Sequence, residues 1–250
     1  MLSIIMSNKK TSKQIKQLTD DELVILDVKK PNHNFIEVHP SLPPVPNITL
    51  FISPPASGKT LLLINFVYRF YKDVFDEIYW CSPTINLDNT LDSSVKKDET
   101  IIKISGADEL MKIDAIIKYL IEEQKNKLEK DEPLEHILLV LDDCISFVNG
   151  KMLLELCTIY RHLKITVWIS IQKMKLLNNT IRTCASNVIS FAIPNKKQRE
   201  QFLDEFDSFP DIEKYYEECT KEKYNWIRLD MRNMKIYHGS PDGIKKIYER

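Results

Sequence analysis

The stretch ITLFISPPASGKTLLLINF, residues 48–66, decides the fold class of this chain of 250 residues. Its first six residues, 48–53, are mostly apolar and β-branched, which predicts a strand that ends at Pro54 and Pro55. A helical pattern, 60–74, begins directly after the turn. A buried strand that passes through a tight turn into a helix is the building unit of α/β proteins.

The turn, SPPASGKT at residues 53–60, matches most of the phosphate-loop pattern GxxxxGK[ST]. In that pattern Gly58 lets the backbone approach a phosphate, Lys59 brings a positive charge to it, and Thr60 offers a hydroxyl to Mg²⁺. An ordinary strand–helix turn with an unrelated lysine is the alternative. We predict a site for ATP and Mg²⁺ that is formed by Ser53, Pro54, Pro55, Ala56, Ser57, Gly58, Lys59 and Thr60; Ser53 replaces the first glycine of the pattern.

Strand and helix patterns alternate along the rest of the chain. Strands are predicted at 76–84, 100–105, 136–143, 165–170 and 187–193, with a terminal pair at 224–231 and 235–239. Helices are predicted at 108–130, 150–162, 178–184, 195–206 and 211–221, and the polar segment 85–99 is predicted to be a surface loop. This order predicts a mostly parallel sheet flanked by helices, the core of a P-loop NTPase.

The first 45 residues have a different character. A strand is predicted at 21–28, and residues 31–47 hold five of the twelve prolines, which oppose both helix and central strand. We therefore predict an extended N-terminal arm over 1–45 and one ATPase domain over 46–250.

The run ILLVLDD at 137–143 predicts a strand buried on both faces that ends in two carboxylates. Such a strand delivers its last side chains to the edge where α/β sheets bind ligands. Asp142 is the candidate metal ligand, and Asp143 is the candidate that polarises the attacking water. The alternative is that both acids cap the next helix.

Two spacings refine the class. Asp142 follows Lys59 by 83 residues, with a predicted strand between them, which favours ring-forming and helicase-like ATPases of the ASCE or RecA-like type over small kinases and GTPases. The next strand, ITVWISIQ at 165–172, ends in Gln172, a candidate sensor of the γ-phosphate.

Composition limits the partners. There are 35 Lys and Arg against 36 Asp and Glu, so no basic coat for nucleic acid exists and any polyanion must meet a local patch or an oligomer. Five scattered Cys without CxxC spacing indicate reduced thiols and an intracellular protein. No segment is apolar over the roughly 18 to 20 residues that cross a bilayer, so no membrane partner is expected.

Four segments together resemble one family: SPPASGKT, ILLVLDD, RHLKITVWISIQ (161–172) and IRTCASNVISF (181–191). They are similar to the FtsK–HerA superfamily, and most of all to the genome-packaging ATPases of large DNA viruses, virophages and polinton-type elements. The resemblance covers roughly residues 48–193. It implies a ring-shaped homo-oligomer that hydrolyses ATP and moves double-stranded DNA into a preformed capsid. A capsid or portal partner, and a place in the host cytoplasm, viral factory or virion, would follow.

In such rings one subunit completes its neighbour's site with an arginine. Arg161 and Arg182, on either side of the predicted strand at 165–170, are the candidates, and a surface role is the alternative for each. Lys173 and Lys175 would face nucleotide, DNA or solvent. Three other functions stay open: a conjugation- or helicase-type DNA motor, a nucleotide-binding scaffold without hydrolysis, and a small-molecule kinase, which would need an Arg-rich lid that the sequence does not show.

Overall fold

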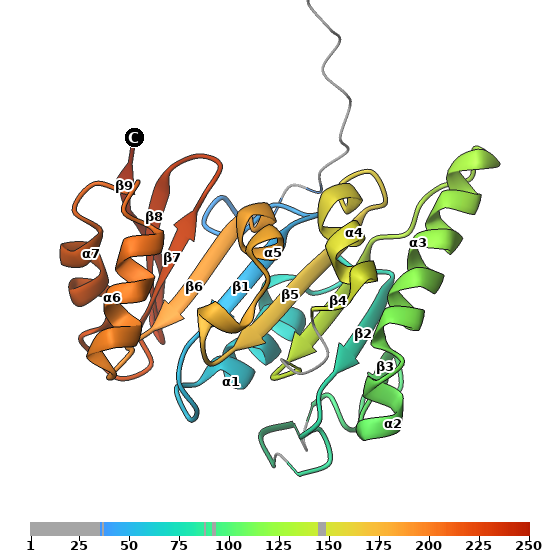
Figure 1. Cartoon of the computed structure of the whole chain (residues 1–250), viewed down its shortest axis with the longest axis horizontal. Coiled ribbons are helices and arrows are strands. Elements are labelled where there is room, and N and C mark those ends of the chain that lie inside the picture. The colour runs from blue at the N-terminus through green and yellow to red at the C-terminus, as the bar shows by residue number, and fades with distance from the viewer. Residues whose placement is uncertain (1–35, 37, 88, 92–93, 145–148) are drawn as a thin grey trace, which may run out of the picture. The chain divides into compact units, whose positions relative to one another are not determined.

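The computed structural model describes residues 36, 38–87, 89–91, 94–144 and 149–250, and its centre is a single sheet (Figure 1). The nine strands are β1 (Ile48–Ile52), β2 (Glu77–Cys81), β3 (Ile101–Ile104), β4 (Ile137–Asp142), β5 (Ile165–Ile171), β6 (Asn187–Phe191), β7 (Trp226–Asp230), β8 (Lys235–Ser240) and β9 (Gly243–Glu249). They are hydrogen-bonded in the order β3-β2-β4-β5-β1-β6-β7-β8-β9. The first six strands of this order are parallel, which confirms the predicted α/β class.

The last three strands extend the sheet beyond β6 with antiparallel pairing. The pair β7–β8 was expected from the sequence, whereas β9 was not. Both faces of β9 carry exposed or half-exposed side chains, so its sequence GIKKIYE lacks the apolar alternation of a buried strand. An edge strand of this kind is held mainly by backbone hydrogen bonds to β8. Such bonds leave no apolar pattern in the sequence.

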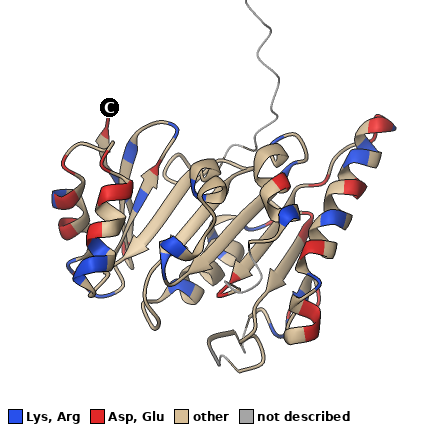
Figure 2. Ribbon diagram, in the orientation of Figure 1, with Lys and Arg blue, Asp and Glu red and all other residues tan. Residues whose placement is uncertain are grey.

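Helices cover both faces of the sheet. They are α1 (Lys59–Asn65), α2 (Ala107–Leu110), α3 (Ile113–Glu129), α4 (Lys151–Ile159), α5 (Asn179–Cys184), α6 (Lys196–Glu205) and α7 (Ile212–Thr220). Helices α3–α7 pack on one face, and α1 packs on the other (Figure 1). Charged residues lie mostly on the helices and connections, and the central strands carry almost none (Figure 2).

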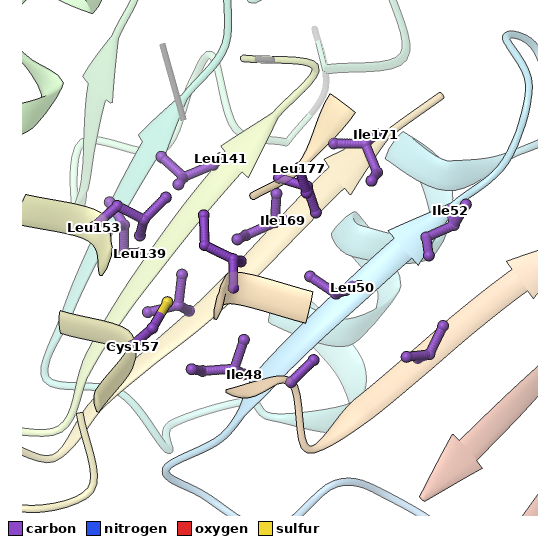
Figure 3. Packing of buried hydrophobic residues seen from close by; sticks show 14 of the residues in the cluster. Ile48, Leu50, Ile52, Leu139, Leu141, Leu153, Cys157, Ile169, Ile171 and Leu177 are labelled. Carbon is purple, nitrogen blue, oxygen red and sulfur yellow. The ribbon is translucent and has the colours of Figure 1, made fainter. Parts of the chain in front are cut away.

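The strand β4 shows why its sequence has no polar alternation. Leu139 and Leu141 pack on the face of α3 and α4, whereas Leu138 and Val140 pack on the face of α1. Figure 3 shows the first of these clusters, where Leu139 and Leu141 lie near Leu153 of α4. Because apolar side chains cover both faces, the only charged residue of the strand is its last one, Asp142, which lies at the edge of the sheet.

The predicted helix 60–74 has two parts. After α1 the chain continues as a π-helix, Phe66–Phe70, in which the N–H of Tyr71 donates to the carbonyl of Phe66 at 2.8 Å. The extra residue widens this turn, a feature often found beside functional sites. The polar loop 85–99 also differs from expectation, because Leu91 and Val95 are fully buried and anchor it to the core.

Part of the predicted arm lies on the domain. Leu42 and Val45 are buried in the cluster on the α1 face, and the hydroxyl of Tyr71 donates to the carbonyl of Pro43 at 2.7 Å. The strand predicted at 21–28 lies outside the described residues. The division at residues 45 and 46 therefore stays a prediction. None of the helices in the described part of the chain is long and apolar enough to span a bilayer.

Candidate active site

The phosphate loop and the acidic strand end meet at the carboxyl edge of the parallel strands. The loop 53–58 follows β1, and Asp142 ends β4. The hydroxyl of Thr60 donates to Oδ2 of Asp142 at 3.2 Å, so residues far apart in sequence form one site. The strand β5 lies between β1 and β4 in the sheet, which is the arrangement expected for ring-forming ATPases.

Ser53 has a structural role that a glycine could not fill. It is completely buried, and its backbone N–H donates to the carbonyl of Ile171 at 3.1 Å. Its hydroxyl accepts a hydrogen bond from the backbone N–H of Phe191 at 2.9 Å. Ser53 therefore ties the start of the loop to both neighbouring strands, β5 and β6.

Lys59 closes the loop from inside. Its ammonium donates to the carbonyls of Ser53 and Pro54, at 2.7 and 2.9 Å, and its side chain is 5% exposed. Burial lowers the pKa of Lys59, and the charges of Asp143 and Asp142 oppose that shift. The loop thus holds a cation beside the two acids, in the position where an incoming phosphate can replace the carbonyls.

The loop backbone turns twice through the left-handed region. Gly58 has φ 102° and Ala56 has φ 58°. A Cβ at Gly58 would lie 3.3 Å from the ring of Tyr224, so glycine satisfies both the dihedral angle and the close approach. Tyr224 therefore lies directly over the phosphate loop, although it belongs to the segment between α7 and β7.

Asp142 has the surroundings of a Mg²⁺ ligand. It is 2% exposed, and its Oδ1 accepts no hydrogen bond of ordinary geometry from a described residue. Burial raises the pKa of Asp142 to about 6; the adjacent Asp143 adds to the rise, while Ser170, Thr60 and Lys59 oppose it. A buried carboxylate oxygen without a well-aligned donor, beside a threonine hydroxyl, fits a cation that takes few protein oxygens and completes its shell with phosphate and water.

Asp143 stands at the mouth of the site. Its backbone adopts φ 51°, and its N–H donates to the carbonyl of Ser170 at 3.2 Å. This turn directs the chain away from β4, and Asp143 lines a cavity of about 560 Å³ together with Lys59, Thr60 and Tyr224. Asp143 is half-exposed, so a water molecule in the cavity has access to it.

The other predicted catalytic residues lie apart from this cavity. Gln172 is exposed after β5 and lines a second cavity, of about 320 Å³, beside α6. Arg161 is exposed before β5, at the opposite edge of the sheet, with its guanidinium 5.6 Å from the ring centre of Tyr160. Arg182 on α5 pairs with Glu205 of α6 at 3.1 Å. Their predicted roles stay predictions.

Tyr224 was not predicted from the sequence as a site residue. It lines the cavity that Asp143, Lys59 and Thr60 also line, which is called the phosphate cavity below, and it lies close to the loop. No motif surrounds it, and its positive φ of 68° becomes visible only in three dimensions. The one sign in the sequence that Tyr224 could bind a ligand is its place in a short polar segment, KEKYN at 221–225. An aromatic side chain in such a segment is expected to be exposed, and binding residues are common in loops.

Comparisons with known proteins agree with this fold. The family model described as Poxvirus A32 protein matches residues 46–204. The crystal structure of B204, the DNA-packaging ATPase from Sulfolobus Turreted Icosahedral Virus, is similar with a TM-score of 0.59 and 14% identity, over 78% of this chain and 97% of that chain. The genome packaging NTPase B204 from Sulfolobus turreted icosahedral virus 2 in complex with ATP-gammaS gives a TM-score of 0.56 and 14% identity, over 78% and 97%. No curated protein matches.

Proposed function

Because this chain belongs to the Poxvirus A32 protein family, we propose that it is an ATP-hydrolysing motor that packages double-stranded DNA into a viral capsid. The family match includes the phosphate loop, the acidic strand end and the strand that follows. The similar fold of two viral packaging enzymes supports the same conclusion. The proposal places the protein in the infected cell.

One observation carries the proposal: Lys59, Thr60 and Asp143 line one cavity at the carboxyl edge, and the hydroxyl of Thr60 donates to Asp142 at the end of β4, with β5 between the two motif strands. A non-hydrolysing scaffold would have no need for both acids. Asp142 is buried and would hold Mg²⁺ with Thr60, whereas Asp143 reaches the cavity. Two carboxylates with different surroundings can take two roles.

The proposed reaction follows from these positions. Mg²⁺, bound by Thr60 and Asp142, would neutralise charge on the β- and γ-phosphates. The ammonium of Lys59 would exchange the carbonyls of Ser53 and Pro54 for phosphate oxygens, which makes its charge available where negative charge develops. Asp143 would accept a hydrogen bond from the attacking water and orient it in line with the bond that breaks.

A neighbouring subunit would complete the site. The described residues that line the phosphate cavity include no arginine, although phosphoryl transfer gains much from one. Arg161 suits this role because it is exposed and lies at the edge of the sheet opposite the cavity, where a neighbour's site can meet it. Arg182 would first have to leave Glu205.

DNA would be contacted at the cavity of about 320 Å³ beside α6, which Gln172 lines and which is called the groove below. Lys173, Lys175 and Lys197 line this groove with several side-chain amides, and no carboxylate is among its lining residues in the described part of the chain. Lysines and amides are the side chains that bind a phosphate backbone. A few such contacts per subunit suffice when several subunits surround one duplex, which reconciles DNA binding with a net charge of −1.

The experiment that tests the function is ATP turnover by the full-length protein with and without linear double-stranded DNA. We expect Mg²⁺-dependent hydrolysis that DNA stimulates and that rises more steeply than linearly with protein concentration. Stimulation by single-stranded DNA alone would favour a helicase-type motor. A concentration-independent monomer without DNA response would contradict the motor. Recovery of the protein with capsid shells would identify the packaging partner.

A further inference from the structure

A third cavity, of about 270 Å³ and called the small pocket below, lies against the phosphate loop on the α1 side of the sheet. Its walls come from three places: α1 with the following π-helix, the end of β6 with the start of β7 and the segment before it, and the β8–β9 turn with the adjoining ends of both strands. The lining residues that matter here are Leu61, Phe70, Phe191, Tyr224, Trp226 and Ile244. This pocket has no part in the phosphate chemistry proposed above.

The two cavities adjoin each other. Gly58, Leu61 and Tyr224 line both the small pocket and the phosphate cavity. A molecule whose phosphates lie on the loop therefore has the small pocket directly beside it, at Tyr224. This neighbourhood favours, as the ligand of the small pocket, a group that is covalently attached to the phosphates on the loop.

The walls of the small pocket suit a flat aromatic ring. Phe191 and Trp226 are 4% and 3% exposed, so they are fixed in the core, whereas Tyr224 is 48% exposed and presents its ring to the opening. The ammonium of Lys223 lies 4.7 Å from the ring centre of Tyr224, a cation–π contact that restrains the ring. Aromatic rings bind nucleobases by stacking on their faces.

The size and the rim of the pocket agree with this ligand. About 270 Å³ is below the usual range of roughly 300–1,000 Å³ for pockets that take a whole drug-sized ligand, so the space fits one ring system. Asn65, Arg69 and Ser240 supply polar groups at the wall. Asn65 ends α1 and Arg69 lies in the widened π-turn, which gives that irregular turn a purpose.

We propose that this pocket binds the nucleobase of the ATP whose phosphates occupy the neighbouring cavity, and that Tyr224 is the stacking residue. The proposal rests on the proposed function only in that it assumes a nucleoside triphosphate on the phosphate loop. It assigns base recognition to the segment between α7 and β7 and to the β8–β9 turn, outside every motif in the sequence.

The test compares two ligands that share the phosphates and differ in the base. Affinities of the Mg²⁺ complexes of a non-hydrolysable ATP analogue and of inorganic tripolyphosphate are measured by calorimetry for the parental protein, Tyr224→Ala and Tyr224→Phe. We expect Tyr224→Ala to weaken the ATP analogue about 5- to 100-fold and to change tripolyphosphate affinity less than twofold. Tyr224→Phe should remain near the parental protein, because the ring persists.

Two further variants make the result decisive. Ile244→Asn alters the opposite wall without touching the phosphate loop and should weaken the ATP analogue selectively; Tyr119→Ala, an exposed tyrosine on α3, is the matched control and should have no effect. Equal loss of both ligands in Tyr224→Ala would mean that the ring only supports the loop, and unchanged ATP affinity in both pocket variants would place the base elsewhere. Either result overturns the base pocket while leaving the motor intact. A parental protein that binds neither ligand would instead contradict the proposed function.

Discussion

Thr60 and Asp142 are joined by a hydrogen bond of 3.2 Å between the hydroxyl and Oδ2. This contact brings the phosphate loop to the acidic strand end across the intervening strand β5, so the site exists before any ligand arrives. Pre-formed sites of this kind bind their ligands without paying the entropy of ordering them. The roles assigned to the surrounding residues lead to the following predictions.

Lys59→Ala should reduce kcat/KM for ATP at least about 100-fold, because the charge that stabilises the transferring phosphate is lost. Asp143→Asn should reduce kcat by a similar factor while the affinity for a non-hydrolysable ATP analogue is kept, since an amide cannot orient water as a base. Steady-state hydrolysis and calorimetry provide the two measurements. Lys125→Ala, which removes a surface lysine paired with Glu155, is the control. Near-parental turnover by Asp143→Asn would show that another acid orients the water.

Asp142 makes the ligand-free protein sensitive to pH. Burial raises its pKa to about 6, from 3.8, so between these values the folded protein binds more protons than the unfolded chain. The free energy of unfolding therefore decreases as pH rises from about 4 to 6 and stays lower above. In EDTA, Asp142→Asn should remove this decrease and stabilise the protein at pH 7.5 by up to about 3 kcal/mol. Denaturant unfolding at pH 5 and 7.5 measures it; parallel pH dependences in the two proteins would refute the assignment.

Ser53 departs from the glycine of the usual pattern and holds the N–H of Phe191. Ser53→Ala leaves that buried donor without a partner and should destabilise the protein by about 1–3 kcal/mol. Ser53→Gly, which restores the usual pattern, should be at least as destabilising because it also frees the backbone. Thermal unfolding compares both with Thr158→Ala, an exposed hydroxyl on α4. A glycine variant as stable as the parent would mean that the hydroxyl contributes nothing.

The groove lysines should control DNA affinity. Neutralising Lys173, Lys175 and Lys197 to Gln should weaken binding to double-stranded DNA and flatten its salt dependence by up to about three units of slope per subunit. Basal ATP hydrolysis without DNA should persist. The matched triple variant replaces Lys118, Lys125 and Lys130 of the α3 region, which are also exposed. Equal losses in both triple variants would point to general charge and not to the groove.

Arg161 and Arg182 should behave differently. Arg161→Ala should lose hydrolysis without loss of stability, and mixing it with Lys59→Ala subunits should restore activity, since some interfaces then pair an intact loop with an intact arginine. Arg182→Ala should lower stability by about 1 kcal/mol, because it removes the ion pair with Glu205 and a hydrogen bond to the carbonyl of Leu177. Mixing experiments that restore activity only with Arg182→Ala would exchange these roles.

The parts of the fold that the sequence predicted are those with buried periodic patterns. The six parallel strands and the pair β7–β8 were all expected, because burial on two faces leaves continuous apolar runs such as 137–141. The motif residues Lys59, Thr60 and Asp142 were brought together as their positions at strand ends implied. The strand between the two motif strands is a correction: the sequence pointed to the strand predicted at 76–84, but β5 lies between β1 and β4, and β2 lies on the far side of β4.

The parts that escaped prediction depend on contacts that no apolar pattern in the sequence encodes. The edge strand β9 has no apolar face, and the widened turn Phe66–Phe70 reads as ordinary helix in the sequence. After β5, Met174 and Leu177 pack into the core and set the direction of the chain. This direction places Gln172 in the groove beside α6. Local propensity contains none of this information.

The antiparallel strands joined to β6 have a consequence for how related proteins diverge. The residues proposed for phosphate chemistry lie on the parallel strands, on α1 and on the loops that connect them, whereas much of the small pocket belongs to the segment from Tyr224 to Ile244. With the base in the small pocket, as proposed, substitutions in that segment would change which nucleotide is preferred and would leave the residues proposed for hydrolysis unaltered. Nucleotide preference could therefore evolve through the C-terminal strands of the domain without any change in the residues proposed for hydrolysis.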